Sequence, residues 1–171
     1  MALSFATSRL KVFEISHDLP LPERANLLGR APEILTPSVT ENLPPYFHGI
    51  DSPERAQAWL ERMLSQSRLF LVETVENKLI GFLFVSSTED RDAHVGYLLA
   101  EEYWGKGLAS ELLQGFIEQA SENEPWARLV CGVDPANIAS ANLLKKLGFF
   151  EQTVKDSDVV FYEYKLARPH S

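Results

Sequence analysis

The hydrophobic positions of this chain follow two different periods. Compact runs of apolar and β-branched residues, which are typical of buried strands, predict strands at 10–15, 69–75, 79–85, 94–99, 128–133 and 159–164. Apolar residues spaced three and four positions apart predict helices over 52–65, 108–120 and 137–147. Most prolines fall before residue 54, so we expect residues 20–50 to form short helix and irregular loop.

Polar and turn-forming residues mark where these helices begin and end. Ser52 and Pro53 form a favourable N-cap and first helical position. Asp134 and Pro135 repeat the pair before the last predicted helix. Gly148 follows that helix and can adopt the left-handed conformation that ends it. The predicted boundaries therefore have local physical causes.

The order of elements predicts the fold class. A meander of three antiparallel strands is followed by a strand–helix–strand unit, which implies a mixed sheet with helices on its faces. We expect an α/β (α+β) architecture with a mostly antiparallel sheet of six to seven strands, the seventh near 149–154. A length of 171 residues predicts a single domain over 1–171.

Composition and charge narrow the class of protein. The chain is 45% hydrophobic and 11% aromatic, which excludes a disordered tail, a collagen-like rod and a coiled coil. Its net charge of −8 argues against binding to nucleic acid phosphates. The excess acid serves either solubility or a cationic partner. The sequence shows no signal peptide and no membrane-spanning run, so we expect a cytoplasmic protein without membrane contact.

Metal and disulfide chemistry are not expected. Cys131 is the single cysteine, which excludes an intramolecular disulfide framework and a cysteine-based zinc site. It lies in an apolar predicted strand, so we expect an inert core thiol. No metal ligand is assigned.

The segment 98–111 is the first candidate for chemistry. It predicts a strand, a turn with Gly105 and Gly107, and the start of a helix. Unpaired backbone N–H groups and the helix dipole favour anions at such a site, and glycines allow close approach. Leu108 follows Gly107 where the phosphate loop of nucleotide hydrolases needs lysine, and the third glycine of the dinucleotide fingerprint is missing. The alternative is an ordinary strand-to-helix turn.

Together with the segment 137–149, these residues resemble the GNAT superfamily of acyl-CoA-dependent N-acetyltransferases. The family's motif, Arg/Gln-x-x-Gly-x-Gly/Ala, corresponds to residues 104–109, with Trp104 in the place of Arg/Gln and matches at Gly107 and Ala109. The forms Trp-Gly-Lys-Gly, Asn-x-x-Ser and Lys-Leu-Gly-Phe look most like the ribosomal-protein-alanine N-acetyltransferase subgroup. The opening Thr7-Ser8-Arg9-Leu10 is similar to that subgroup's first strand.

The resemblance implies a splayed central strand pair that binds acetyl-CoA. Backbone groups of the first strand would pair with pantetheine, the turn amides would hold the pyrophosphate, Asn137 would contact the pantetheine end and Ser140 would lie near the thiol. The implied cofactor-binding residues are Leu98, Leu99, Trp104, Gly105, Lys106, Gly107, Leu108, Ala109, Asn137 and Ser140. The alternatives are a self-satisfied helix start at Asn137 and a small packing residue at Ser140.

The implied reaction is direct attack of a primary amine on the acetyl carbonyl of acetyl-CoA. Ser140 is the candidate proton donor to the thiolate and His94 the candidate proton relay. Two positions where family members carry a catalytic Glu and a Tyr acid are Gly132 and Leu144 here. Glu73 and Glu101 are weaker candidates for the base, and deprotonation through water is a further option. The alternative function is a non-catalytic acyl-CoA-binding sensor module.

The wall of the acceptor site is expected in the loop 43–49. Its irregular backbone and the aromatic residues Tyr46 and Phe47, which we expect to be exposed, suggest substrate binding. Tyr103 is expected to stack on the cofactor or to pack. The acceptor can be a protein N-terminus or a small amine, and a cationic amine would suit the excess acid. The chain can be a monomer or a homodimer.

Overall fold

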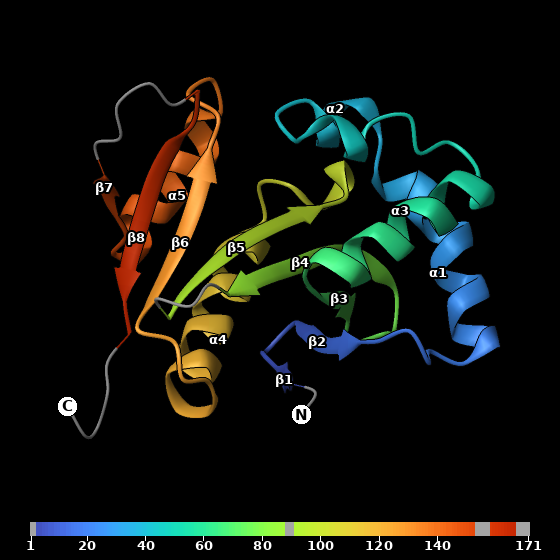
Figure 1. The fold of residues 1–171 in the computed structure, drawn as a ribbon, viewed down its shortest axis with the longest axis horizontal. Coiled ribbons are helices and arrows are strands. Elements are labelled where there is room, and N and C mark those ends of the chain that lie inside the picture. The colour runs from blue at the N-terminus through green and yellow to red at the C-terminus, as the bar shows by residue number, and fades with distance from the viewer. Residues whose placement is uncertain (1–2, 88–90, 153–157, 167–171) are drawn as a thin grey trace.

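The computed structural model describes residues 3–87, 91–152 and 158–166, and within these ranges the strands form one sheet. Figure 1 shows the sheet, whose strand order is β1-β2-β3-β4-β5-β6-β8-β7. The strands are β1 (Ser4–Ala6), β2 (Leu10–Ile15), β3 (Arg68–Thr74), β4 (Leu79–Ser87), β5 (Asp92–Leu99), β6 (Arg128–Val133), β7 (Phe150–Gln152) and β8 (Val160–Lys165).

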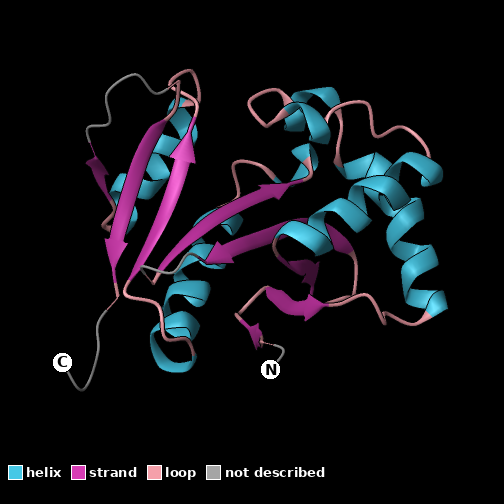
Figure 2. Ribbon diagram, in the orientation of Figure 1, coloured by secondary structure: helices cyan, strands magenta, loops and turns pink. Residues whose placement is uncertain are grey.

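Helices cover both faces of this sheet (Figure 2). The helices are α1 (Leu21–Ile34), α2 (Pro37–Thr40), α3 (Pro53–Gln66), α4 (Leu108–Asn123) and α5 (Ile138–Leu147), with short 3-10 turns at Pro45–Phe47 and Glu101–Tyr103. The side chains of α1 and α3 pack in one hydrophobic cluster, and those of α4 and α5 pack in another. None of the described helices is long and apolar enough to cross a membrane.

The predicted mixed sheet is confirmed, with more strands than expected. All described strand pairs are antiparallel except β5 and β6. The sequence pattern missed β1 because three residues are too few to show a period. The optional strand at 149–154 contains β7, and residues 153 and 154 lie outside the described residues.

The predicted caps are confirmed at the start of α3 and the end of α5. The start predicted at Asp134 and Pro135 is wrong, because α5 begins at Ile138 with Asn137 as its N-cap. The side chain of Ser52 accepts a hydrogen bond from the Arg55 N–H, and α3 begins at Pro53. Gly148 ends α5 with a φ of 105°, the left-handed conformation that glycine adopts without strain. The region expected to hold short helix contains the 14-residue α1 instead, because Pro22 lies in its first turn, where the missing N–H costs nothing.

The central strands β5 and β6 separate after a short parallel ladder. Their pairing runs from Asp92 opposite Arg128 to His94 opposite Val130. Beyond that pair β5 continues to Leu99 while β6 continues to Val133, and Figure 1 shows the two strands diverging. The predicted splayed pair is therefore present.

Candidate active site

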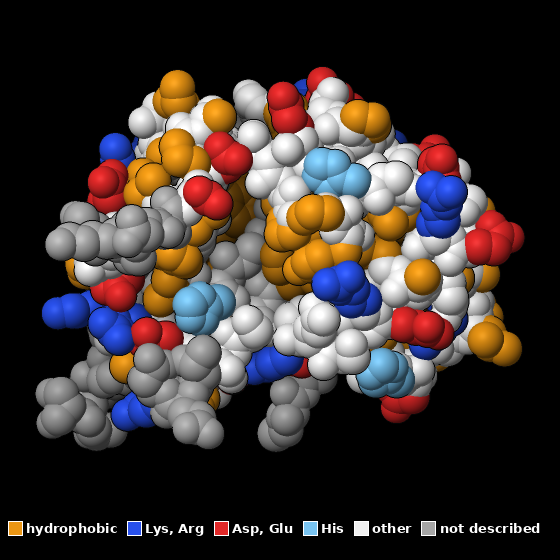
Figure 3. All heavy atoms as spheres, turned by 45° about the horizontal axis from the view of Figure 1, so that its top comes forward, with side chains coloured by type: hydrophobic (Ala, Val, Ile, Leu, Met, Phe, Trp, Pro, Cys, Tyr) orange, Lys and Arg blue, Asp and Glu red, His pale blue; other side chains and the backbone are white. Residues whose placement is uncertain are grey.

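A cavity of about 540 Å³ occupies the opening between β5 and β6. Its walls come from the loop 42–46, the end of α3, the end of β4, both splayed strands and the start of α5. Figure 3 shows the surface hollowed between the side of the molecule that carries β6 and β8 and the side that carries α2 and α3. The sheet itself creates this space because two neighbouring strands cease to pair.

The register of β5 decides which of its backbone groups face the opening. The Ala100 N–H donates to the Ile80 carbonyl of β4 at 2.7 Å, and the Ala127 N–H donates to the Arg91 carbonyl at 2.9 Å. Because backbone groups alternate along a strand, even-numbered residues of β5 face β4 and odd-numbered residues face β6. The polar groups of Leu99 therefore point into the opening. Those of Leu98 point to β4.

Trp104 contacts the backbone at the end of β5. Its indole N–H donates to the Leu99 carbonyl at 2.8 Å, although the side chain is 47% exposed. This contact fixes the indole at the position where the family motif has Arg or Gln. It occupies the Leu99 carbonyl and leaves the Leu99 N–H directed into the opening.

The turn before α4 has the conformation that an anion site requires. Gly105 and Gly107 have φ values of 72° and 78°, in the left-handed region that favours glycine. Gly107 is the N-cap of α4, and no side chain caps this end of the helix. The first N–H groups of α4 therefore have no intrahelical acceptor, and the helix dipole makes this end attractive to phosphate.

The start of α5 is capped, in contrast. The Asn137 side-chain oxygen accepts from the Ser140 N–H at 3.2 Å, which satisfies the helix end locally. This contact uses the oxygen of the Asn137 amide, so its NH₂ group can donate to a ligand in the cavity. Both residues line the cavity.

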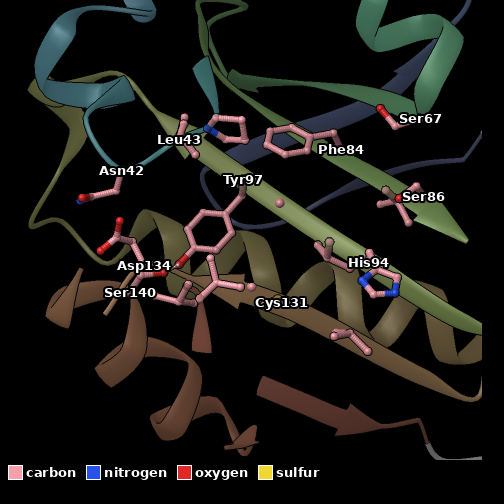
Figure 4. Close-up of a pocket in the computed structure, with 18 of the residues that line it drawn as sticks. Asn42, Leu43, Ser67, Phe84, Ser86, His94, Tyr97, Cys131, Asp134 and Ser140 are labelled. Atoms are coloured by element: carbon pink, nitrogen blue, oxygen red, sulfur yellow. Dashed lines mark hydrogen bonds between the residues drawn. The ribbon is translucent and has the colours of Figure 1, made fainter. Parts of the chain in front are cut away.

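Tyr97 and Ser140 meet across the opening. The Tyr97 hydroxyl lies 2.7 Å from Ser140 Oγ and links β5 to α5, as Figure 4 shows. Burial raises the pKa of Tyr97 to about 12, with the Ser140 hydrogen bond lowering it and Cys131 raising it. The phenol is therefore neutral near pH 7 and can donate a proton or a hydrogen bond. The sequence analysis did not identify Tyr97. The only sequence signal for it was its odd residue number in the strand that separates from β6.

Cys131 lies on β6 within the lining of the same cavity. Its thiol is 2% exposed, and burial raises its pKa to about 12. Because the thiolate is the reactive form, this thiol is inert near neutral pH, as the sequence predicted.

A family model described as an acetyltransferase (GNAT) domain matches residues 30–150. The chain belongs to the GNAT acetyltransferase family. An uncharacterized N-acetyltransferase p20 from Bacillus licheniformis is 36% identical over 69 residues, which are 40% of this chain and 38% of that protein. The similarity thus spans well under half of this relative.

Solved GNAT structures share the whole fold. The ribosomal L7/L12 α-N-protein acetyltransferase RimL, solved with coenzyme A, has a TM-score of 0.70 and 16% identity, over 94% of this chain and 96% of that chain. The spermidine/spermine N-acetyltransferase SpeG of Vibrio cholerae has a TM-score of 0.70 and 18% identity, over 94% and 95%. Because these identities are low, they establish the fold and not the acceptor.

The two positions to which the resemblance assigns the Glu base of some members and the Tyr acid of many members both line the cavity. Gly132 and Leu144 occupy them, and neither can exchange a proton. Asp134 is the carboxylate of the described lining, and its Oδ1 accepts from the Ala136 N–H at 2.8 Å. Tyr97 supplies a hydroxyl to the cavity from β5, whereas the position of Leu144 lies on α5.

His94 lines the cavity away from Ser140. It is three residues from Tyr97 on β5, which corresponds to about 10 Å along a strand. An odd separation also places the two side chains on opposite faces of the sheet. Figure 4 shows His94 at the far end of the site from the Tyr97–Ser140 pair, so the structure does not bring His94 to Ser140. Glu73 and Glu101 do not belong to the described lining.

The two aromatic residues of the loop 43–49 have different environments. Tyr46 lines the cavity, and the Arg62 guanidinium stacks on its ring at 4.0 Å. Phe47 is completely buried, with its ring 5.9 Å from Trp59 and 5.3 Å from Phe84. The expectation that Phe47 is exposed to substrate is wrong, because the turn at Pro45–Phe47 directs its side chain into the core beside α3.

The remaining aromatic candidate, Tyr103, packs against both hydrophobic clusters, and the Lys78 ammonium lies 5.6 Å from its ring centroid. Among the described residues, no group of three His, Cys, Asp or Glu side chains is arranged to hold a metal ion.

Proposed function

We propose that this protein is a single domain that transfers the acetyl group of acetyl-CoA to a primary amine by direct attack. The main support is the opening between β5 and β6 together with the uncapped N-terminus of α4, the helix that follows β5 in the chain. The opening would take an extended amide-containing arm, and the uncapped helix end would take phosphates. Neither feature depends on the identity of the acceptor.

Acetyl-CoA would supply a thioester carbonyl as the acetyl donor. The Leu99 N–H and the backbone N–H and carbonyl of Tyr97 face the opening. They are positioned to pair with the pantetheine amides, which would bind as an added strand does. This assigns the pairing to Leu99 and Tyr97 in place of Leu98. The backbone amides of residues 105–109 would hold the pyrophosphate, with Lys106 adding positive charge. The Asn137 NH₂ group would hold the donor near its thiol end.

Ser140 and Tyr97 would complete the proton balance at sulfur. As the new C–N bond forms, the C–S bond breaks and the leaving thiolate needs a proton. Ser140 Oγ–H would donate it, and the neutral Tyr97 hydroxyl would hold and recharge Ser140 through their 2.7 Å hydrogen bond. A backbone N–H in the opening would polarise the acetyl carbonyl.

The amine must lose one proton before it attacks, because primary amines are protonated near pH 7. His94 lines the same cavity on the face opposite Tyr97, so it would accept this proton through water from the acceptor side. The donor and acceptor protons would then follow separate routes.

The described lining favours an acceptor with a single positive charge. Asp134 is its carboxylate, while the other described lining residues include Leu43, Met63 and Phe84. A polyamine carries several charges and needs several acidic partners, whereas a protein N-terminus carries one. We therefore propose a protein N-terminus or a comparable monoamine as the acceptor. The excess acid of the chain does not gather in this lining.

Calorimetry and thiol release test this function. Acetyl-CoA should bind at micromolar concentration, and no binding at high micromolar concentration would remove the donor assignment. Thiol release should then be measured with peptides of different N-terminal residues and with spermidine. Turnover with peptides supports the proposal. Binding without turnover of any amine would identify a non-catalytic acyl-CoA sensor instead.

A further inference from the structure

The loop that precedes α4 is held by a residue that lies 97 positions earlier in the sequence. Arg9 lies in the turn between β1 and β2, and its Nη1 donates to the Lys106 carbonyl at 2.9 Å. Its Nε donates to Glu111 Oε1 at 2.7 Å, and its backbone N–H donates to Glu111 Oε2 at 2.8 Å. The Thr7 hydroxyl also donates to Glu111. One arginine therefore joins the glycine loop to the first turn of α4.

Close packing of the first hairpin against α4 supports this contact. A Cβ at Gly115 would come within 2.9 Å of both Phe5 Cε2 and Thr7 Cγ2. Only glycine leaves room for the hairpin at this distance from the helix. The hairpin therefore contacts α4 both at its first turn and further along, which fixes the position of Arg9.

The charge of Glu111 makes Arg9 necessary for an anion at this loop. A carboxylate in the first turn suits the helix dipole but repels a pyrophosphate at the same helix end. Burial alone would raise the pKa of Glu111, but the hydrogen bonds from Thr7 and Arg9 outweigh it and hold this pKa below its ordinary value. The carboxylate therefore stays charged at neutral pH, and Arg9 is the cation that offsets it.

The guanidinium also lies beside the glycine that opens the helix. A Cβ built at Gly107 would be 3.5 Å from Arg9 Nη2, and the side chain of Arg9 remains half exposed. The arginine is thus next to the amides that would face the phosphates, with part of its surface accessible.

We propose that Arg9 is a positioning residue for the phosphate-binding loop: it fixes residues 105–107 and offsets the charge of Glu111, so that the pyrophosphate of the donor can bind. This rests on the proposed function, because it assumes an acyl-CoA donor. It assigns a role in the phosphate site to the first hairpin, which contributes no residue to the described cavity lining.

The first experiment needs no donor. Hydrogen exchange of the backbone amides of residues 105–109 should be compared between the unmodified protein, Arg9→Ala and Arg9→Lys. Loss of the clamp should speed exchange in Arg9→Ala by about tenfold, the effect of losing about 1.4 kcal/mol of local stability. Arg24→Ala is the matched control, because the exposed guanidinium of Arg24 donates to a backbone carbonyl of another loop, that of His17. Unchanged exchange in Arg9→Ala would overturn the proposed clamp.

The second experiment separates phosphate from thioester binding. Acetyl-CoA should be compared with S-acetylpantetheine, which has the same reactive end and no phosphate. Arg9→Ala should raise the KM of acetyl-CoA by about tenfold with kcat within about twofold, and leave the KM of S-acetylpantetheine unchanged. Arg9→Lys keeps the positive charge but lacks the planar guanidinium with its several donors, so its KM for acetyl-CoA should lie between those of the unmodified protein and Arg9→Ala.

The outcomes distinguish the two proposals. An equal rise of KM for both donors would show a general structural defect and overturn the phosphate role of Arg9. If the unmodified protein binds no acetyl-CoA, the proposed function fails, while the hydrogen-exchange result still decides whether Arg9 holds the loop. Thermal unfolding of each variant shows that the comparison is made on folded protein.

Discussion

The hydroxyl of Tyr97 lies 2.7 Å from Oγ of Ser140, and this contact joins β5 to α5 across the splayed strands. If Ser140 protonates the thiolate, Ser140→Ala should lower kcat by roughly 100-fold, the lower range for a general acid. Tyr97→Phe should lower kcat by about fivefold, as expected for loss of a neutral hydrogen bond. Thiol release at saturating acetyl-CoA measures both effects.

The control for this pair is Ser121→Ala, because Ser121 donates to the Ile117 carbonyl within α4 and lies outside the described cavity lining. The double variant should lose little more than Ser140→Ala alone, since Tyr97 acts through Ser140. Fully additive losses would show that the two hydroxyls act independently and would contradict the proposed relay.

The raised pKa of Tyr97 predicts a loss of stability at alkaline pH. The folded value of about 12 exceeds the ordinary 10.0, so above pH 10 the unfolded chain loses a proton that the folded protein keeps. This favours unfolding, and the contribution is lost as pH rises through that window. In Tyr97→Phe the fall in unfolding free energy from about pH 8 to about pH 11 should be smaller by roughly 1.4 kcal/mol. Urea titrations at the two pH values measure it, and an identical fall in both proteins would contradict the assigned burial.

The glycine loop can be tested with a matched pair of substitutions. Gly107→Glu places a charged side chain at the proposed pyrophosphate site and should abolish acetyl-CoA binding in calorimetry. Gly49→Glu is the control, because Gly49 has a φ of 73° and its built Cβ also lies 3.5 Å from an arginine nitrogen. Both variants carry the same backbone strain, of about 1–2 kcal/mol. Normal binding by a folded Gly107→Glu protein would remove the loop from the donor site.

The adjacent aromatics of the loop 43–49 should respond differently to truncation. Tyr46→Ala should raise the amine KM by several-fold and leave acetyl-CoA binding unchanged, because Tyr46 lines the cavity. Phe47→Ala should instead lower the free energy of unfolding by about 3–5 kcal/mol, because Phe47 is completely buried. Steady-state kinetics and urea unfolding separate these effects. Unchanged amine kinetics in Tyr46→Ala would exclude this loop from the acceptor site.

Arg68 joins three elements of the core and should control stability at acidic pH. It donates to Glu14 at 2.8 and 2.9 Å and to Glu124 at 2.9 Å, linking β3 to β2 and to the end of α4. Burial raises the pKa of Glu14, but hydrogen bonds from Arg68 and the Leu3 N–H outweigh it and lower the value. Arg68→Met should cost about 2–3 kcal/mol at pH 7, less than for a fully buried pair because Arg68 is partly exposed.

The sign of this pH effect follows from the lowered pKa of Glu14. Its contribution is present above the ordinary value of 4.5 and is lost as pH falls through the lower folded value. Arg68→Met should therefore lose less stability than the unmodified protein between about pH 7 and pH 3. Arg55→Met is the control, since Arg55 forms an exposed pair with Asp51 at 3.6 Å. An equal acid dependence in all three proteins would remove Glu14 from the acid transition.

The sequence correctly predicted the features that depend only on neighbouring residues in the chain. Ser52 caps α3 and Gly148 ends α5, because each needs only its immediate neighbours in the chain. The glycine turn before α4 was predicted for the same reason. The strand β1 was missed, because three residues are too few to show a period.

The candidate site was only partly predictable. Ser140 and Asn137 were found through a motif, whereas Tyr97 and Arg9 were not, because their roles come from partners 43 and 102 positions away. Phe47 was assigned to the surface because a proline-rich loop gives no sign of which side chain turns inward. These assignments need the tertiary arrangement.

The sequence by itself determined the main strands and helices, the start of α3, the end of α5, the inert core thiol and the resemblance to the GNAT family, since all depend on residue type and short-range spacing. The tertiary structure alone decided that odd-numbered residues of β5 face the opening, that Tyr97 meets Ser140 and that Arg9 holds the loop before α4. The physical reason is register: which groups meet depends on where β5 and β6 stop pairing and how the first hairpin packs on α4.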